Sequence, residues 1–268
     1  MIRRPPRSTP LYSSAASDVY KRQVQPKQYF DPYPWQKMAL PRSVPNDLED
    51  MPRLAITRSR SELNGIAKFP DNQKRMWSAY YASVTFMDEQ VGRILGELDR
   101  LGLREKTAIV FTSDHGYHLG EHTFWQKSNL HEEVTRVPLV ISMPGLNPGR
   151  SSSLVELVDL FPTLSAAAGL QAPGDLHGTS LLPILKDPCA RVKESALSIH
   201  GSGTSMRTAQ WTYTRYKDGS EELYDMENDP GQFTNRARVK ESEQALAIHR
   251  RAFDKRLRAA GLNPTKVR

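Results

Sequence analysis

The chain has 268 residues, of which 25% are charged and 38% are hydrophobic, and its mean hydropathy is −0.58. Its apolar runs are shorter than the roughly 18 residues of a membrane-spanning helix, so the composition predicts a globular protein with no membrane span. A single cysteine, Cys189, excludes an internal disulfide and a thiolate metal cluster.

The formal net charge is +7, and most of it lies at the N-terminus. Residues 1–23 carry a surplus of +4, which leaves +3 for all later residues, so a nucleic-acid surface is not expected. This segment has no signal-peptide core and no helical or strand period. It resembles translated sequencing-adapter sequence. We therefore expect residues 1–23 to be a disordered, non-native extension, with the native protein beginning upstream.

The next segment, 24–65, is rich in proline and interleaves aromatic residues, which predicts an extended stretch that packs on a larger body. Asp71 then stands where a helix N-cap is expected. Apolar residues follow every three or four positions until Gly102, so we predict one long helix here: its apolar positions are Met76, Tyr80, Val84, Met87, Val91, Ile94 and Leu98.

A continuous apolar run over 108–111 leads into small polar residues, as is typical of a buried parallel strand whose C-terminal end opens into a site. Another central strand is predicted from Val137. A helical pattern starts near Ser153 and is closed by Gly169. These elements predict an α/β core over 24–178, with a mostly parallel central sheet flanked by helices.

Beyond Gly178 the pattern changes to short strands separated by turn residues, which predicts an antiparallel subdomain over 179–268. The chain ends in an amphipathic helix over 241–260, whose charges we interpret as a solvated face. The predicted strands are Ala196–His200, Trp211–Tyr216 and Glu222–Tyr224.

Chemically active side chains gather after the strand that ends near Phe111, where open α/β sheets bind ligands. Asp114 and His115 can donate an oxygen and a nitrogen to one cation, and Lys127 follows nearby. We therefore predict a metal or anion site. The alternative is an Asp-His turn that caps the next helix, with His118 and His122 in solvent.

Four segments resemble, in order, the C-terminal half of a sulfatase of the alkaline-phosphatase-like superfamily, closest to the iduronate-2-sulfatase type. The resemblance implies an alkaline-phosphatase-like fold that lacks its N-terminal strands. The segments are YYASVTFMDEQVGRILGELDRLGL, TSDHGYHLGEHTFWQKSNLHEEVTRVPLVISMPG, SLVELVDLFPTLSAAAGL and ELYDMENDPGQFTN.

The resemblance implies roles for individual residues. Asp114 and His115 match two ligands of the active-site metal, for which calcium is expected, with manganese or zinc as alternatives. Lys127 matches a lysine that binds the substrate's sulfate, where a compact cation neutralises developing charge. His122 matches a Gly-Glu-His segment and is expected to support the site or to act at the leaving group. No role is implied for His118.

Sulfatases attack sulfur with a formylglycine made from a Cys/Ser-x-Pro-x-Arg motif, and this sequence contains no such motif. We therefore expect a fragment of an enzyme that hydrolyses sulfate esters of a sugar or glycan and is periplasmic or secreted, with the nucleophile upstream. Two alternatives remain open: a phosphonate monoester or phosphodiester hydrolase of the same superfamily, and a non-catalytic protein that binds a metal or an anionic glycan.

Overall fold

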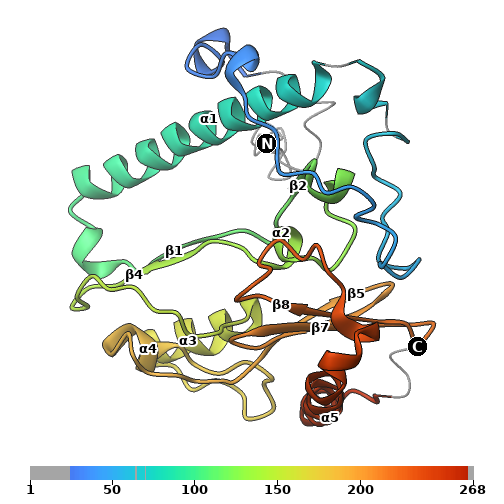
Figure 1. The fold of residues 1–268 in the computed structure, drawn as a ribbon. Helices are drawn as coiled ribbons and strands as arrows, with labels where there is room; N and C mark the ends of the chain where they lie inside the picture. The colour runs from blue at the N-terminus through green and yellow to red at the C-terminus, as the bar shows by residue number, and fades with distance from the viewer. Residues whose placement is uncertain (1–24, 64, 70, 265–268) are drawn as a thin grey trace, which may run out of the picture. The chain divides into compact units, whose positions relative to one another are not determined.

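The computed structural model describes residues 25–63, 65–69 and 71–264 (Figure 1). The chain divides into two compact units, which we describe separately. The predicted extension, 1–23, lies outside the described residues, and the domain boundaries at 24–178 and 179–268 stay predictions. No described helix is long and apolar enough to cross a membrane. Among the described residues, unit 1 comprises 25–42, 59–63, 65–69, 71–102 and 117–127, and unit 2 comprises 43–58, 103–116 and 128–264.

The centre of unit 1 is the helix α1 (Asn72–Arg100), which follows Asp71 as predicted. Only part of its predicted apolar face is covered: Met76 is 5% exposed, whereas Ile94 is 69% exposed. Short 3₁₀ turns precede the helix, and the shorter elements of the unit are η2 (Lys27–Tyr29), η3 (Trp35–Lys37), η4 (Ile66–Lys68), β2 (His118–Leu119), η6 (Glu121–Thr123) and β3 (Trp125–Gln126).

Aromatic residues from the proline-rich segment pack on α1, as the sequence predicts. Tyr29 meets Phe86 edge to face with ring centroids 5.1 Å apart, and its hydroxyl donates to Glu89 at 2.5 Å. Tyr33 stacks on Tyr81 at 5.4 Å. Such pairs add to the burial of apolar area, so α1 is the platform that orders the segment.

In unit 2, β1 (Ile109–Thr112) pairs with β4 (Leu139–Ser142), and the pairing is antiparallel. The prediction that these strands run parallel is therefore wrong for this pair. Parallel neighbours need a crossover connection, and the connection in unit 2 contains only the four-residue helix α2 (Glu132–Thr135). Burial is also incomplete, because Val140 is 59% exposed.

The helix predicted from Ser153 begins later than expected. A 3₁₀ turn, η7 (Leu157–Asp159), leads into α3 (Leu160–Ala167). Glu156 stays extended because its backbone N–H donates to Asp159 at 2.7 Å, in a capping box. The predicted stop holds: Gly169 adopts φ 69°, which suits glycine. The remaining short helices of this region are η5 (Arg104–Lys106) and α4 (Leu182–Lys186).

The C-terminal part of unit 2 is a four-stranded antiparallel sheet in the order β5-β6-β7-β8, which confirms the predicted antiparallel subdomain (Figure 1). Strand β6 was not predicted, because GTSMR has no alternating apolar pattern. A Cβ at Gly203 would lie 2.5 Å from the carbonyl oxygen of Arg215 on β7, so close pairing requires glycine. The strands are β5 (Ala196–His200), β6 (Gly203–Arg207), β7 (Trp211–Tyr216) and β8 (Glu221–Asp225).

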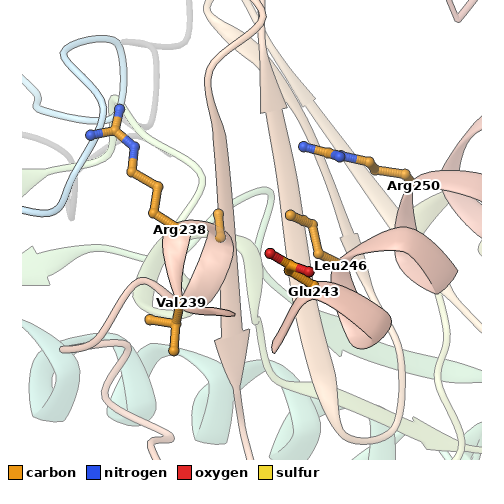
Figure 2. Close-up of a pocket in the computed structure, with 6 residues that line it drawn as sticks. Arg238, Val239, Glu243, Leu246 and Arg250 are labelled. Atoms are coloured by element: carbon orange, nitrogen blue, oxygen red, sulfur yellow. The ribbon is translucent and has the colours of Figure 1, made fainter. Parts of the chain in front are cut away.

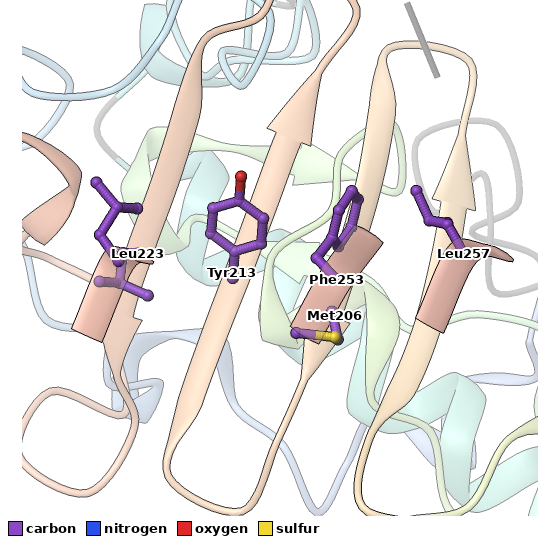
Figure 3. Packing of buried hydrophobic residues seen from close by; sticks show 6 residues of the cluster. Met206, Tyr213, Leu223, Phe253 and Leu257 are labelled. Atoms are coloured by element: carbon purple, nitrogen blue, oxygen red, sulfur yellow. The ribbon is translucent and has the colours of Figure 1, made fainter. Parts of the chain in front are cut away.

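After β8 the chain forms η8 (Arg236–Arg238) and η9 (Lys240–Ser242) and enters the terminal helix α5 (Glu243–Ala259), beside which a pocket opens (Figure 2). The predicted helix is confirmed. Its apolar residues pack against the four-stranded sheet (Figure 3), where Tyr213, Leu223, Phe253 and Leu257 are all fully buried. This helix and sheet form a core of their own within unit 2.

Candidate functional site

Only Ser113 separates Asp114 and His115 from β1, so the pair lies at the C-terminal end of this strand as predicted. The two residues form a tight local turn. The backbone N–H of His115 donates to Asp114 Oδ1 at 3.0 Å, and the Ser113 hydroxyl donates to the His115 carbonyl at 2.8 Å. The Asp114 side chain is 83% exposed and that of His115 is 25% exposed. The carboxylate is therefore open to a ligand from solvent, while the ring is held closer to the protein.

The His115 ring has a defined orientation. Its Nδ1 lies 2.9 Å from the carbonyl oxygen of Gly116. A carbonyl oxygen can only accept, so Nδ1 is the donor, and in the neutral ring Nε2 then carries a lone pair. Nε2 lies 3.4 Å from Asp114 Oδ2. Two ligands each about 2.4 Å from a cation, at a right angle, are separated by about this distance. The pair therefore fits adjacent positions on one metal ion.

These two donors do not complete a metal site. Among the described residues, no group of three or more His, Cys, Asp or Glu side chains is placed to hold a metal. A calcium ion takes roughly six to eight oxygen ligands. Within the described chain, Asp114 and His115 therefore supply only part of a coordination sphere.

Gly116 holds the pair against α2. Its N–H donates to the Val134 carbonyl at 2.8 Å, and a Cβ on Gly116 would lie 1.9 Å from the carbonyl oxygen of Glu133. No side chain fits in that space. The role of this glycine is thus a close approach between two backbone segments. The turn after Asp114 is consequently anchored to the helix that precedes β4.

Lys127 and His122 belong to unit 1, whereas Asp114 and His115 belong to unit 2. Lys127 is half-buried and directly follows β3, which pairs with β2 in a short hairpin. The hairpin is fixed from both sides: the Trp77 indole donates to the Leu119 carbonyl at 2.7 Å, and the Trp125 indole donates to Ser61 at 2.6 Å. Trp125 is fully buried and Trp77 is partly buried, and with both indole N–H groups satisfied they fix the hairpin that leads to Lys127.

The backbone before Lys127 is strained. His122, Thr123 and Gln126 have φ values of 53°, 63° and 70°. Non-glycine residues rarely adopt this left-handed region, and threonine is especially unfavourable there. Such strain gathers at functional sites, where the surrounding structure holds it. The amino-acid sequence gives no sign of this strain, because none of these residues is the glycine or asparagine that signals a left-handed turn.

The histidines of the hairpin are buried. His118 and His122 are 0% and 2% exposed, so neither lies in solvent as the alternative interpretation required. The His122 ring packs near His118 and Phe124, with centroids 6.3 and 5.8 Å away. Burial raises the pKa of Glu121, but hydrogen bonding with His118 and Leu119 outweighs it and holds that pKa below its usual value. His122 thus lies inside the hairpin that precedes Lys127.

A second buried polar cluster, which the sequence analysis missed, lies within unit 2. Glu222 on β8 is fully buried and accepts hydrogen bonds from the hydroxyls of Tyr216 at 2.6 Å and Tyr224 at 2.9 Å. His131 Nε2 lies 3.5 Å from the same carboxylate. Burial raises the pKa of Glu222, but the His131 charge and these hydrogen bonds lower it below its usual value. The cluster ties the segment before α2 to the C-terminal sheet.

Comparison with protein-family models confirms the predicted resemblance. The model described as Sulfatase matches residues 16–170, and the model described as N-sulphoglucosamine sulphohydrolase, C-terminal, matches residues 120–259. Both matches include Lys127, and the first also includes the whole hairpin together with Asp114 and His115.

Curated relatives carry the same family name. A sulfatase of Formosa agariphila is 31% identical over 222 residues, covering 79% of this chain and 43% of that protein. Bovine arylsulfatase K is 34% identical over 64% of this chain and 35% of its own length. Human iduronate 2-sulfatase is 43% identical, over 38% of this chain and 24% of its length. The chain therefore spans less than half the length of these relatives, and they do not separate the iduronate type from arylsulfatase K.

Two solved structures illustrate the fold. A phosphonate monoester hydrolase from Silicibacter pomeroyi superposes with a TM-score of 0.78, at 24% identity, covering 91% of this chain and 54% of its own. A protein solved with its substrate, D-glucosamine-2-N,6-O-disulfate, gives a TM-score of 0.67 at 25% identity, covering 74% of this chain and 45% of its own. The sulfatase-like fold predicted from the sequence is confirmed at this level.

Proposed function

The chain belongs to the sulfatase family, and from this premise we propose that the whole protein hydrolyses sulfate esters of a sulfated sugar or glycan. The main support from the structure is the pair Asp114 Oδ2 and His115 Nε2, 3.4 Å apart at the end of β1. Relatives add support for the substrate class, since one neighbour is solved with a sulfated glucosamine as its substrate. We further propose that β1 and β4 belong to a larger, mostly parallel sheet.

In this proposal Asp114 and His115 hold a calcium ion, for which manganese or zinc is the alternative. A divalent cation held by these residues would polarise the sulfate oxygens. The carboxylate supplies the hard oxygen ligand that calcium prefers, and the hydrogen bond from Nδ1 to Gly116 makes Nε2 the ring nitrogen of His115 that would ligate the ion. These residues orient the ester and do not themselves attack sulfur.

Lys127 is proposed to bind the sulfate group. Its ammonium is a compact cation on a half-buried stem, so it can neutralise charge that grows on the oxygens as the S–O bond breaks. His122 is proposed to support this lysine. A ring that is 2% exposed is better placed to fix the hairpin than to protonate a leaving group. The attacking group is expected to be a formylglycine, for which this sequence has no Cys/Ser-x-Pro-x-Arg motif.

The test is a substrate panel on the full-length gene product with calcium: a chromogenic aryl sulfate, a sulfated disaccharide, a phosphonate monoester and a phosphodiester. We expect the sulfate esters to turn over fastest, and Lys127→Ala to reduce that turnover while Lys186→Ala leaves it unchanged. Faster turnover of the phosphonate ester or the phosphodiester would favour the other hydrolase class of this fold. Binding of calcium or of a sulfated glycan without turnover of any ester would favour a non-catalytic protein.

A further inference from the structure

The outward face of α5 carries three cations in one line. Arg251, Lys255 and Arg258 recur at spacings of four and three, which places them on one side of a helix. All three are exposed, and none forms an ion pair within the described residues. We call these three residues the α5 cationic face. They span about 10 Å along the helix axis at 1.5 Å per residue.

Packing fixes the direction of this face. Leu246, Phe253 and Leu257 on the opposite side of α5 are buried against the sheet, so the helix cannot rotate its cations away from solvent. The nearby acid, Asp254, does not neutralise the face, because it pairs with Arg215 at 2.7 Å. The face is therefore a fixed, uncompensated line of positive charge.

The other arginines of the helix are used differently. Arg250 pairs with Glu221, and Arg256 pairs with Glu156 at 2.9 Å. These pairs join α5 to the rest of unit 2. The contrast between paired arginines and the α5 cationic face indicates that holding the helix in place does not account for all of its positive charge.

A cavity of about 420 Å³ lies beside α5, between this helix and η8. Figure 2 shows Arg238 on the η8 side and Arg250 on the α5 side, with Glu243 and Leu246 between them. Arg238 is exposed and has no ion pair among the described residues. The groove therefore adds a fourth available guanidinium or ammonium group next to the helix.

Positive charge is concentrated here rather than spread over the chain. Residues 236–258 contain eight lysines and arginines and three acids, a net charge of +5. All residues after 23 together have a net charge of only +3, so the remainder of the body is slightly acidic. A long-range field of one sign over one surface attracts a polyanion to that surface.

We propose that the α5 cationic face, together with Arg238, is a docking surface for the chain of a sulfated polysaccharide. This rests on the proposed function, which makes a sulfated glycan the substrate class. Guanidinium groups donate paired hydrogen bonds to tetrahedral oxyanions, and repeated sulfates on a linear polymer match repeated cations along a helix. Docking there would retain a polymer at the protein between successive cleavages.

The chemistry of the face favours a sulfated glycan over a nucleic acid. Proteins that bind single-stranded nucleic acids stack the bases on exposed aromatic rings. The aromatic ring of α5, Phe253, is fully buried in the core instead. A surface of cations without exposed aromatic rings binds a polyanion through its charge density and makes no stacking contacts with bases.

The test is binding of heparin to the 268-residue chain at about 0.1 M NaCl, where charges farther apart than about 10 Å are screened. We expect the triple variant Arg251→Gln, Lys255→Gln, Arg258→Gln to weaken heparin binding about hundredfold, because each cation at an anionic surface contributes about fivefold. The variant Arg251→Lys, Arg258→Lys keeps the charges but loses the paired hydrogen bonds, so it should bind heparin more weakly than the parent and more tightly than the triple variant.

The matched control is the triple variant Arg53→Gln, Arg150→Gln, Lys186→Gln, which removes the same number of arginine and lysine charges. These three residues are exposed and lie on other segments of unit 2. An equal loss of heparin binding in this control would overturn the proposal, since it would show net charge alone at work. The proposal would also be overturned if duplex DNA bound as tightly as heparin and lost the same affinity in the triple variant. Unsulfated hyaluronan that bound with the same affinity as heparin would overturn it as well.

Aryl sulfate turnover by the full-length protein separates this inference from the proposed function. The triple variant should turn over a small aryl sulfate as fast as the parent. Unchanged heparin binding in the triple variant overturns the docking surface whatever the turnover. Absence of turnover with selective heparin binding intact counts against the enzyme and leaves the docking surface supported.

Discussion

Two parts of unit 2 are held together in different ways. The sheet β5–β8 and α5 share a core in which Tyr213, Leu223 and Phe253 are fully buried. The pair β1 and β4, which leads to Asp114, leaves Phe111 37% and Val140 59% exposed. Apolar burial stabilises the first part from within, since each fully buried large side chain contributes about 1.5–3 kcal/mol. The candidate metal pair follows the less buried part and is fixed by backbone contacts to α2.

The largest expected effect tests this contrast directly. Phe253→Ala removes a fully buried ring and should lower the free energy of unfolding by about 3–5 kcal/mol. Phe111→Ala, at a position more than a third exposed, should cost clearly less. Urea unfolding of both variants measures the difference. Equal losses would mean that the strand pair is as tightly packed as the C-terminal core.

Removing Lys127 should affect activity and not stability. On the proposed function, Lys127→Ala lowers kcat/KM for a sulfate ester about hundredfold to thousandfold, as expected for one lost charge-stabilising group. Thermal unfolding should change little, because the side chain is only half-buried. Lys186→Ala, on the exposed end of α4, serves as the control in both assays. A large loss of stability in Lys127→Ala would assign the lysine to structure instead.

Low pH should reduce the stability of the C-terminal sheet and α5, because Glu222 becomes protonated. Its pKa is lowered in the fold, so it contributes stability above its unfolded pKa of about 4.3 and loses it as pH falls through the folded pKa. Glu222→Gln should cost about 1.5–3 kcal/mol at pH 7, because Tyr216, Tyr224 and His131 lose a charged partner. Urea unfolding across pH 3–7, a range chosen to bracket the carboxyl pKa, measures this effect. The free energy of unfolding should fall less steeply with decreasing pH in the variant than in the parent.

If the free energy of unfolding fell equally steeply with decreasing pH in the parent and in Glu222→Gln, Glu222 would not be the group responsible for the acid sensitivity. Asp218→Asn is the matched control: the pKa of this exposed carboxyl is also lowered, through hydrogen bonds from Ser220, but it lies in a turn outside the buried cluster. This variant should change the pH dependence of the free energy of unfolding only slightly, since local hydrogen bonds to an exposed carboxyl add little stability.

The smallest expected effect concerns the backbone contact that holds the metal pair. Gly116→Ala places a Cβ against the Glu133 carbonyl and forces the two segments apart, at a cost of about 1–2 kcal/mol. Calcium affinity should fall with it, because Asp114 and His115 move with the turn. Gly174→Ala, at a position with open space around it and no left-handed φ, is the control for the same substitution without crowding. Unchanged calcium affinity in Gly116→Ala would show that α2 does not position the pair.

Local patterns were sufficient for the elements that depend on neighbouring residues alone. Apolar spacing predicts α1 and α5, turn residues predict the strands β5, β7 and β8, and the position of Asp114 and His115 after an apolar run predicts their place at a strand end. These features follow from periodicity and from residue chemistry, both of which are present in a few consecutive residues. The ordered motifs likewise predict the sulfatase family.

Tertiary structure alone decided the features that depend on distant partners. The antiparallel direction of β1 and β4 and the burial of Glu222 against His131 each join residues far apart in the chain. The close pairing of β6 with β7 depends on the room that Gly203 leaves for the Arg215 carbonyl. The left-handed backbone at Thr123 opposes its own local preference and persists because the hairpin is fixed by Trp77 and Ser61. A sequence pattern records what each residue favours by itself, whereas strand direction, buried charge and strain are set by what the rest of the fold imposes.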